Sequence, residues 1–170
     1  GTCITNGSTL TLIDKVAPAI TSTVATNVSD CNTANGTITI TATSAQGSVE
    51  YSIDAGASWQ PSNVFSALAA GTYQIRVRNI DETCEVSDAD VTITQPVTPS
   101  ITTVASNDPT NCGVNDGDIT ITATGSSLEY SIDGGTNWQA GNMFNGLAAG
   151  TYNISVRNGD ATCETLYTSN

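Results

Sequence analysis

The chain has 170 residues, and its 16 Asp and Glu residues outnumber its 4 Lys and Arg residues, which gives a net charge of −12 without any histidine. Such a chain has no basic surface that could neutralise phosphates, so nucleic acids and anionic membranes are excluded as partners. It also has no apolar run long enough to cross a membrane and no histidine for a catalytic triad. We therefore expect no membrane insertion, no enzymatic activity and no cofactor.

The sequence contains a long internal repeat. FSALAAGTYQIRVRNIDETCE, residues 65–85, matches FNGLAAGTYNISVRNGDATCE, residues 144–164, at 15 of 21 positions. A repeat of this length predicts two small domains of about 80 residues each. We expect an N-terminal extension with a spare strand at 1–16, a first repeat at 17–97 and a second repeat at 98–170.

The spare strand is predicted at Thr9–Ile13, where leucines and threonines alternate. Leu10 and Leu12 share one face, and they align at an offset of 81 with Val91 and Ile93, which belong to the end of the first repeat. The predicted strand consists of Thr9, Leu10, Thr11, Leu12 and Ile13.

Each repeat is predicted to consist of short strands with period-2 alternation, and no window has an apolar stripe of helical period. In the first repeat we expect strands within Ile20–Thr26, Gly36–Thr43, Val49–Gln60, Ala70–Asn79 and Ala89–Gln95. In the second repeat we expect them within Ile101–Asn107, Gly117–Thr124, Leu128–Gln139 and Ala149–Asn158. Strands of this length and spacing predict a β-sandwich in each repeat.

The second repeat has no counterpart of the closing strand Ala89–Gln95, because Asn170 aligns with Val91. Two explanations stay open. In the first, Thr9–Ile13 of one subunit fills the open sheet edge of the second repeat of the next subunit, which gives a head-to-tail polymer of identical subunits. In the second, the 170 residues are a window from a longer tandem array.

Five cysteines favour an oxidising location, extracellular or at the cell surface. Cys31 is equivalent to Cys112, and Cys84 is equivalent to Cys163. The repeat thus predicts the disulfides Cys31–Cys84 and Cys112–Cys163, each closing a loop of about fifty residues and contributing about 4 kcal/mol in the chain-entropy model. Cys3 is left over, and an odd cysteine in a secreted chain indicates a possible intermolecular disulfide.

Each repeat carries the pattern S-x-D-x-G-x-x-W. Its residues are Ser52, Asp54, Gly56 and Trp59 in the first repeat and Ser131, Asp133, Gly135 and Trp138 in the second. The pattern resembles the Asp-box hairpin of sialidases and other β proteins. That resemblance implies a structural role in which the Asp side chain caps backbone N–H groups of the turn and the Trp packs at its base.

The segments LAAGTY at 68–73 and 147–152 resemble the tyrosine corner of immunoglobulin-like and fibronectin-type sandwiches, with Tyr73 and Tyr152 as the tyrosines. More widely, the unit TITITAT…YSIDGGTNW…LAAGTYNISVRN…TC resembles the repeats of large bacterial surface adhesins and extracellular filament proteins. This resemblance implies an all-β fold of two tandem immunoglobulin-like β-sandwich domains, extracellular display, and adhesion or scaffolding without enzymatic activity.

Three aspartates of the second repeat, Asp108, Asp116 and Asp118, are a weak candidate for a Ca²⁺ site, since carboxylates are ligands of that ion. Asp-Gly runs are more often turns, and we expect no metal. Glu50 and Glu129 are expected to be solvated.

Three classes of function remain. The leading one is a structural or adhesive module of an extracellular fibre or long surface protein, with identical subunits, surface glycans or other cells as partners. The second is a carbohydrate-binding module with Trp59 and Trp138 as stacking platforms, which requires solvent-facing rings. A hydrolase is the least favoured, because no paired acids recur in a cleft.

Overall fold

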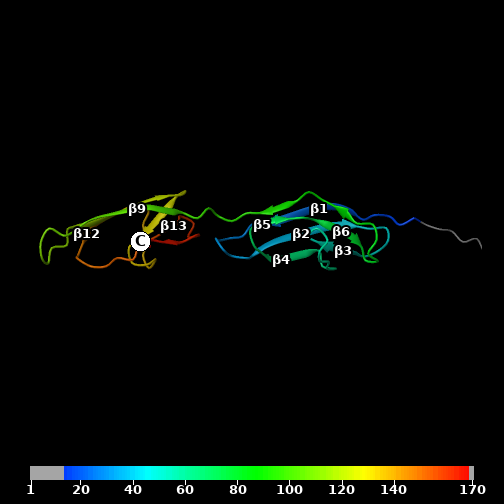
Figure 1. The fold of residues 1–170 in the computed structure, drawn as a ribbon, viewed down its shortest axis with the longest axis horizontal. Helices are drawn as coiled ribbons and strands as arrows, with labels where there is room; N and C mark the ends of the chain where they lie inside the picture. Colours follow the sequence, from blue (N-terminus) through cyan, green and yellow to red (C-terminus); the bar gives the residue numbers. More distant parts are fainter. Residues whose placement is uncertain (1–13, 169–170) are drawn as a thin grey trace, which may run out of the picture. The chain divides into compact units, whose positions relative to one another are not determined.

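The computed structural model describes residues 14–168, and every regular element in that range is a β-strand (Figure 1). The earlier strands are β1 (Ala19–Thr26), β2 (Gly36–Thr43), β3 (Val49–Ser52), β4 (Val64–Leu68), β5 (Gly71–Tyr73), β6 (Arg76–Asn79), β7 (Val86–Ser87) and β8 (Val91–Ile93). The later strands are β9 (Ser100–Asn107), β10 (Gly117–Thr124), β11 (Leu128–Ser131), β12 (Met143–Leu147), β13 (Ser155–Asn158) and β14 (Thr165–Leu166). Within residues 14–168, no helix is long and apolar enough to cross a membrane.

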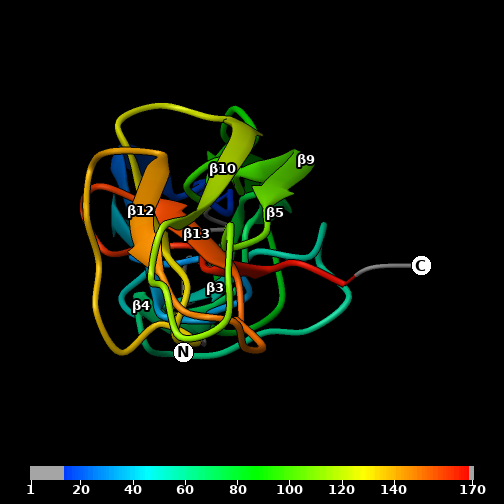
Figure 2. The ribbon, with the colours of Figure 1, turned by 90° about the vertical axis from the view of Figure 1, so that its left-hand side faces the viewer.

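The strands of each repeat form two principal sheets. The first repeat has the orders β1-β2-β4 and β3-β6-β7, with β5 and β8 as a further pair. The second has β12-β10-β9 and β11-β13-β14, and Figure 2 shows β10 between β12 and β9. In chain order these are the A-B-E and C-F-G sheets of an immunoglobulin-type sandwich. The predicted all-β fold with antiparallel sheets is confirmed.

Alternation along the strands explains the core. In β2, Ile38 and Ile40 are fully buried, while the threonines between them are half-exposed. In the later part of the chain, Ile119 and Ile121 of β10 form a cluster with Ile154, which lies just before β13, and with Val156 of β13 in the opposite sheet. One face of each sheet is therefore apolar, and burial of the two facing surfaces holds the sandwich together.

The chain forms two compact units whose boundaries do not coincide with the repeat. The first unit comprises the described residues up to Thr26 with Thr37–Ser66 and Gly71–Thr92. The second comprises Asn27–Gly36, Ala67–Ala70 and the chain from Ile93 onward. The division at 1–16, 17–97 and 98–170 stays a prediction.

The expected closing strand at Ala89–Gln95 is present as the shorter strand β8, and a further short strand, β7, lies just before the predicted range. β7 pairs with β6, and β8 pairs with β5. The interruption between β7 and β8 matches the interruption between their partner strands β6 and β5, where Gln74 forms a β-bridge with Asp54 instead. Asp88 lies in the break, where its amide bonds the Ile75 carbonyl and its carboxylate accepts from the Ala89 amide.

The predicted disulfide pairing is wrong. Cys31 is bonded to Cys163, with 5.0 Å between their Cα atoms, and Cys84 and Cys112 are free thiols. The physical reason is that the loop 27–36 belongs to the second unit, where one carboxylate oxygen of Asp30 accepts hydrogen bonds from the amides of both bonded cysteines at 2.7 Å. Cys84 lies in the first unit. Cys3 and the predicted strand Thr9–Ile13 lie outside the described residues.

Candidate functional site

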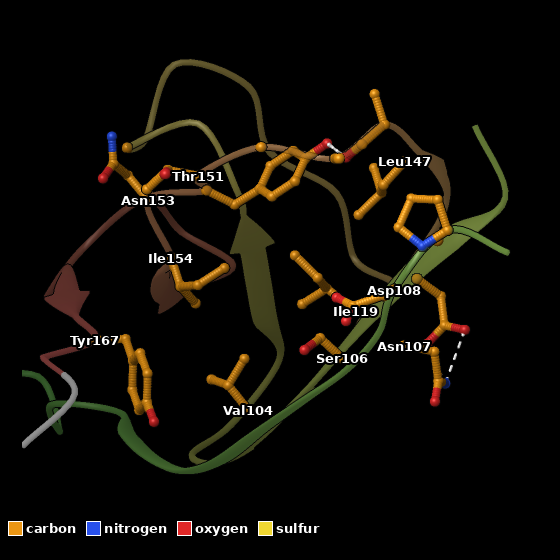
Figure 3. Close-up of a pocket in the computed structure, with 18 of the residues that line it drawn as sticks. Val104, Ser106, Asn107, Asp108, Ile119, Leu147, Thr151, Asn153, Ile154 and Tyr167 are labelled. Atoms are coloured by element: carbon orange, nitrogen blue, oxygen red, sulfur yellow. Dashed lines mark hydrogen bonds between the residues drawn. The ribbon is translucent and has the colours of Figure 1, made fainter. Parts of the chain in front are cut away.

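The second unit contains an open groove of about 760 Å³ between its two sheets (Figure 3). Its walls come from β9 and the residues after it, from the start of β10, from the segment between β12 and β13, and from the end of the described chain. Among the lining residues are Val104, Ser106, Asn107, Asp108, Ile119, Leu147, Thr151, Asn153, Ile154 and Tyr167. Figure 3 shows Val104, Ile119, Leu147 and Ile154 around the same space. The groove is therefore apolar at its base.

The corresponding place in the first repeat is filled by β8. Ile93 of that strand is 1% exposed, and its Cγ2 lies 3.0 Å from the point where a Cβ on Gly36 would stand. Ile38 and Ile75 are 0% exposed in the first repeat, whereas their equivalents Ile119 and Ile154 are each 7% exposed. Within the part of the chain that the structure describes, the second unit thus has the same apolar floor as the first repeat, without the strand that covers it.

The sheet edge beside the groove is unpaired in the described chain. In the first repeat, β5 pairs with β8, and Thr72 Oγ1 lies 3.3 Å from Thr92 Oγ1 across the pair. The equivalent residues 150–152 form no strand. Their backbone N–H and C=O groups can accept a strand by main-chain hydrogen bonding.

The rim of the groove differs from the first repeat at one hydrogen bond. In the first repeat the Val28 amide donates to the Thr94 carbonyl at 3.2 Å, and Asn27 Oδ1 accepts from the Thr94 amide at 2.9 Å. The equivalents in the second repeat are Pro109 and Asp108. Asp108 retains an acceptor, but Pro109 has no N–H, so a strand in this groove makes one fewer bond at that end.

The two S-x-D-x-G-x-x-W segments form hydrogen-bonded turns. Asp133 Oδ1 accepts from the amide and hydroxyl groups around it, including the Asn137 amide at 2.9 Å, and Trp138 Nε1 donates to the Gly135 carbonyl at 2.8 Å. These bonds, chiefly the one from the Asn137 amide, lower the pKa of Asp133 to about 2. In the first repeat, bonds from Ser58 lower the pKa of Asp54 to about 2 in the same way. Both carboxylates are occupied in holding a turn, and neither is placed as a catalyst.

The remaining motif residues also lie in these turns. Ser52 Oγ donates to Asp54 Oδ1 at 2.7 Å and accepts from the Gly56 amide at 2.9 Å. Ser131 makes the same contacts with Asp133 and Gly135, at 2.8 and 2.9 Å. A serine hydroxyl that donates to the carboxylate and accepts from the turn amide fixes the turn at both ends.

Each repeat has a Glu–Arg–Trp stack that sequence reasoning missed. Arg157 lies 4.2 Å from the ring centroid of Trp138, and its Nη2 lies 2.7 Å from Glu129 Oε2. In the first repeat Arg78 lies 4.3 Å from the Trp59 ring and pairs with Glu50 at 2.9 Å. The glutamates, which we expected to be solvated, are half-buried and ion-paired, because antiparallel pairing of β3 with β6 and of β11 with β13 sets each glutamate opposite an arginine.

This stack bears on carbohydrate binding. Both indole rings are half-buried, and one face of each is covered by a guanidinium group. A sugar that stacks on an indole needs an open ring face, and the cation already occupies one of the two.

The sequence did contain a signal for the Glu–Arg–Trp stack, which is the opposite charge of the glutamate and arginine that pair across the strands.

Other predicted sites are placed as follows. Tyr152 donates its hydroxyl to the Ala148 carbonyl at 2.8 Å, and Tyr73 is half-buried at the equivalent place. The candidate calcium ligands bond elsewhere, since Asp116 accepts from the Thr110 amide at 2.8 Å and Asp118 accepts from Asn107 Nδ2. Among the described residues, the one cluster of potential metal-ligating side chains is Asp30 with Cys31 and Cys163, and both its sulfurs are in the disulfide. The structure does not bring the three aspartates together.

These features define an all-β chain of several antiparallel sheets in which, within residues 14–168, no strand covers the groove of the second unit. No protein-family model and no curated protein matches the chain. Among solved structures, it is similar to a C-terminal 282-residue fragment of intimin in complex with the intimin-binding domain of the translocated intimin receptor, at 16% identity and a TM-score of 0.37. The match covers 89% of this chain, which spans 63% of the fragment's length.

Proposed function

We propose that this chain is a non-enzymatic structural subunit of an extracellular bacterial filament or surface adhesin. Its copies join head to tail when Thr9–Ile13 of one copy, the donor copy, fills the groove in the second unit of another, the acceptor copy. The observation that carries this proposal is the groove itself, whose counterpart in the first repeat is filled by β8. The disulfide between Cys31 and Cys163 supports an oxidising, extracellular setting.

The proposed strand matches the groove residue by residue. Leu12 aligns with Ile93, and its side chain would cover Gly117, Ile119 and Ile154 as Ile93 covers the equivalent floor. Leu10 aligns with Val91 on the same face. A strand of alternating leucine and threonine thus presents its apolar side to the groove and its hydroxyls outward.

The register follows from the cross-strand threonine pair. Thr11 aligns with Thr92, whose hydroxyl lies 3.3 Å from that of Thr72, and Thr72 aligns with Thr151 of the groove. Thr11 of the donor copy therefore faces Thr151 of the acceptor copy on the outer side of the sheet. A shift by one residue would turn Leu10 and Leu12 outward, so the apolar floor selects this register.

The test is self-association of the full chain carrying Cys3→Ser, Cys84→Ser and Cys112→Ser, without reductant so that the Cys31–Cys163 bond is kept, measured by sedimentation velocity over a range of concentrations. Leu12→Asp places a charge on the groove floor and removes about 3 kcal/mol of apolar burial, so association weakens roughly 100-fold or more. Thr11→Asp is the matched control, because it adds the same charge to the outward face and leaves association largely intact. Equal association of the Leu12→Asp variant and the unmodified chain contradicts strand donation.

A tandem array is the second reading of the same groove, with the strand supplied by the same polypeptide. A synthetic peptide of residues 8–16 separates the two. Self-association that the peptide inhibits supports donation between copies. Binding of the peptide to a chain that stays monomeric at all concentrations favours the array, and absence of peptide binding removes the groove as a strand site.

A further inference from the structure

We infer that Cys112 of the acceptor copy forms a disulfide with Cys84 of the donor copy, so that each strand-joined pair of copies is also covalently linked. This inference rests on the proposed head-to-tail assembly and specifies its chemistry. It differs from the expected role of Cys3, because the two thiols it uses are those that the described structure leaves free.

The first observation is the bridge already formed in the chain. Cys31 and Cys163 are equivalent to Cys112 and Cys84, respectively, so the structure contains one complete example of the proposed bond. In that example Asp30 Oδ1 accepts from both cysteine amides at 2.7 Å. Asp30 thus supplies a hydrogen-bond acceptor that holds the backbones of the two bonded cysteines together.

The loop around Cys112 has the conformation of the loop around Cys31. The Cys112 amide donates to Asn111 Oδ1 at 2.8 Å, as the Cys31 amide donates to Asp30. The residue after each cysteine has a positive φ, 76° at Gly113 and 57° at Asn32. The loop that carries Cys112 therefore already has the backbone conformation seen around the bonded Cys31, and Cys112 is exposed.

The loop around Cys84 likewise has the conformation of the loop around Cys163. The two cysteines have φ values of 55° and 56°. Each loop has the same backbone hydrogen bond of 3.0 Å, from the Asn79 amide to the Thr83 carbonyl and from the Asn158 amide to the Thr162 carbonyl. Both cysteine positions therefore present the same backbone to an incoming loop.

The hydrogen bond that joins each cysteine loop to the residues before its repeat is also found in both repeats. Asn158 Nδ2 donates to the Val97 carbonyl at 3.0 Å, just after β8, and Asn79 Nδ2 donates to the Val16 carbonyl at 3.0 Å, just after the proposed donor strand. Val16 and Val97 are equivalent at an offset of 81. A groove that holds Thr9–Ile13 as the first repeat holds β8 therefore has its Cys112 beside Cys84 of the donor copy.

The bond needs an oxidant, and an extracellular disulfide compound such as oxidised glutathione supplies it. One protein thiolate attacks the oxidant, releases one reduced thiol and leaves a mixed disulfide. The second thiolate displaces the other reduced thiol and closes the protein disulfide. Two protein thiols lose two electrons and two protons in total, and the oxidant gains both.

The experiment uses the full chain in a Cys3→Ser background with oxidised and reduced glutathione, followed by heating in SDS without reductant. We expect a ladder of covalent multimers that reductant collapses. Cys84→Ser and Cys112→Ser each abolish the ladder when alone. A mixture of the two variants gives a covalent dimer and nothing larger, because only one complementary pair of thiols remains.

Cleavage after glutamate identifies the bond, since Glu82, Glu85 and Glu129 place Cys84 in residues 83–85 and Cys112 in residues 86–129. A 83–85 peptide linked to 86–129 within the dimer band supports the inference. Absence of a ladder in the Cys3→Ser background, together with a ladder in the double variant Cys84→Ser/Cys112→Ser that retains Cys3, overturns it.

Sedimentation of the Cys3→Ser/Cys84→Ser/Cys112→Ser variant without reductant, which keeps the Cys31–Cys163 bond, separates the two proposals. Association without any ladder leaves strand donation intact and refutes the bridge. Absence of both refutes the assembly itself. Leu12→Asp, which keeps both thiols, is expected to lose the ladder, and a ladder that persists in this variant shows that the thiols pair without the strand.

Discussion

The bond between Cys31 and Cys163 closes a loop with a sequence separation of 132 residues. In the chain-entropy model this cross-link stabilises the folded chain by about 5 kcal/mol, against about 4 kcal/mol for each of the two shorter loops expected from the sequence. Replacing Cys163 with serine should therefore lower the unfolding free energy of the second unit by about that amount. With a urea m value of about 2 kcal/mol/M, the midpoint falls by roughly 2.5 M.

The assay is urea unfolding followed by Trp138 fluorescence in a Trp59→Phe background, so that the reporter lies in the second unit. Cys31→Ser should cost as much as Cys163→Ser, and the double variant should cost no more than either, because both remove the same bond. Cys84→Ser is the matched control and should change stability by about 0.5 kcal/mol or less, as for a residue outside any such bond. A Cys84→Ser loss equal to that of Cys31→Ser refutes the observed pairing and restores the one expected from the repeat.

Two further predictions concern the turns and the stacks. The pKa of Asp133 is lowered to about 2 from an ordinary value near 4, so its ionised form stabilises the fold above pH 4, and this contribution is lost as the pH falls toward 2. Asp133→Asn should therefore lower the urea midpoint at pH 7 and leave it close to that of the unmodified chain at pH 2. An equal loss of stability at both pH values contradicts this role of Asp133. Arg157→Met keeps the apolar stem but removes the cation from Trp138 and the partner of Glu129, so acrylamide should quench Trp138 fluorescence more strongly and the unfolding free energy should fall by about 1 kcal/mol. Arg76→Met is the control. Quenching that Arg157→Met leaves unchanged shows that the guanidinium does not cover the ring.

Local structure was largely predictable from the sequence. The alternation in Gly36–Thr43 and Gly117–Thr124 predicted β2 and β10 with their observed bounds, because a strand with one buried face needs an apolar residue at every second position. The S-x-D-x-G-x-x-W pattern predicted its turns, because the Asp and Ser side chains reach backbone amides only a few residues away.

Contacts between distant residues were less predictable. The pairing of Glu129 with Arg157 depends on the register between β11 and β13, and that register is set by which faces of the sheets are buried. The short strand β7 before the closing strand β8, and the break between them, depend on the gap between β6 and β5, the strands with which they pair.

The disulfide pairing is another contact between distant residues that the sequence does not determine. The repeat alone established that Cys31 is equivalent to Cys112 and that Cys84 is equivalent to Cys163. A pairing within each repeat and a pairing from one repeat to the next both respect that equivalence, so the sequence does not distinguish them. The tertiary structure distinguishes them, because the loop 27–36 packs in the second unit, where Asp30 holds Cys31 against Cys163 and leaves Cys84 and Cys112 as free thiols.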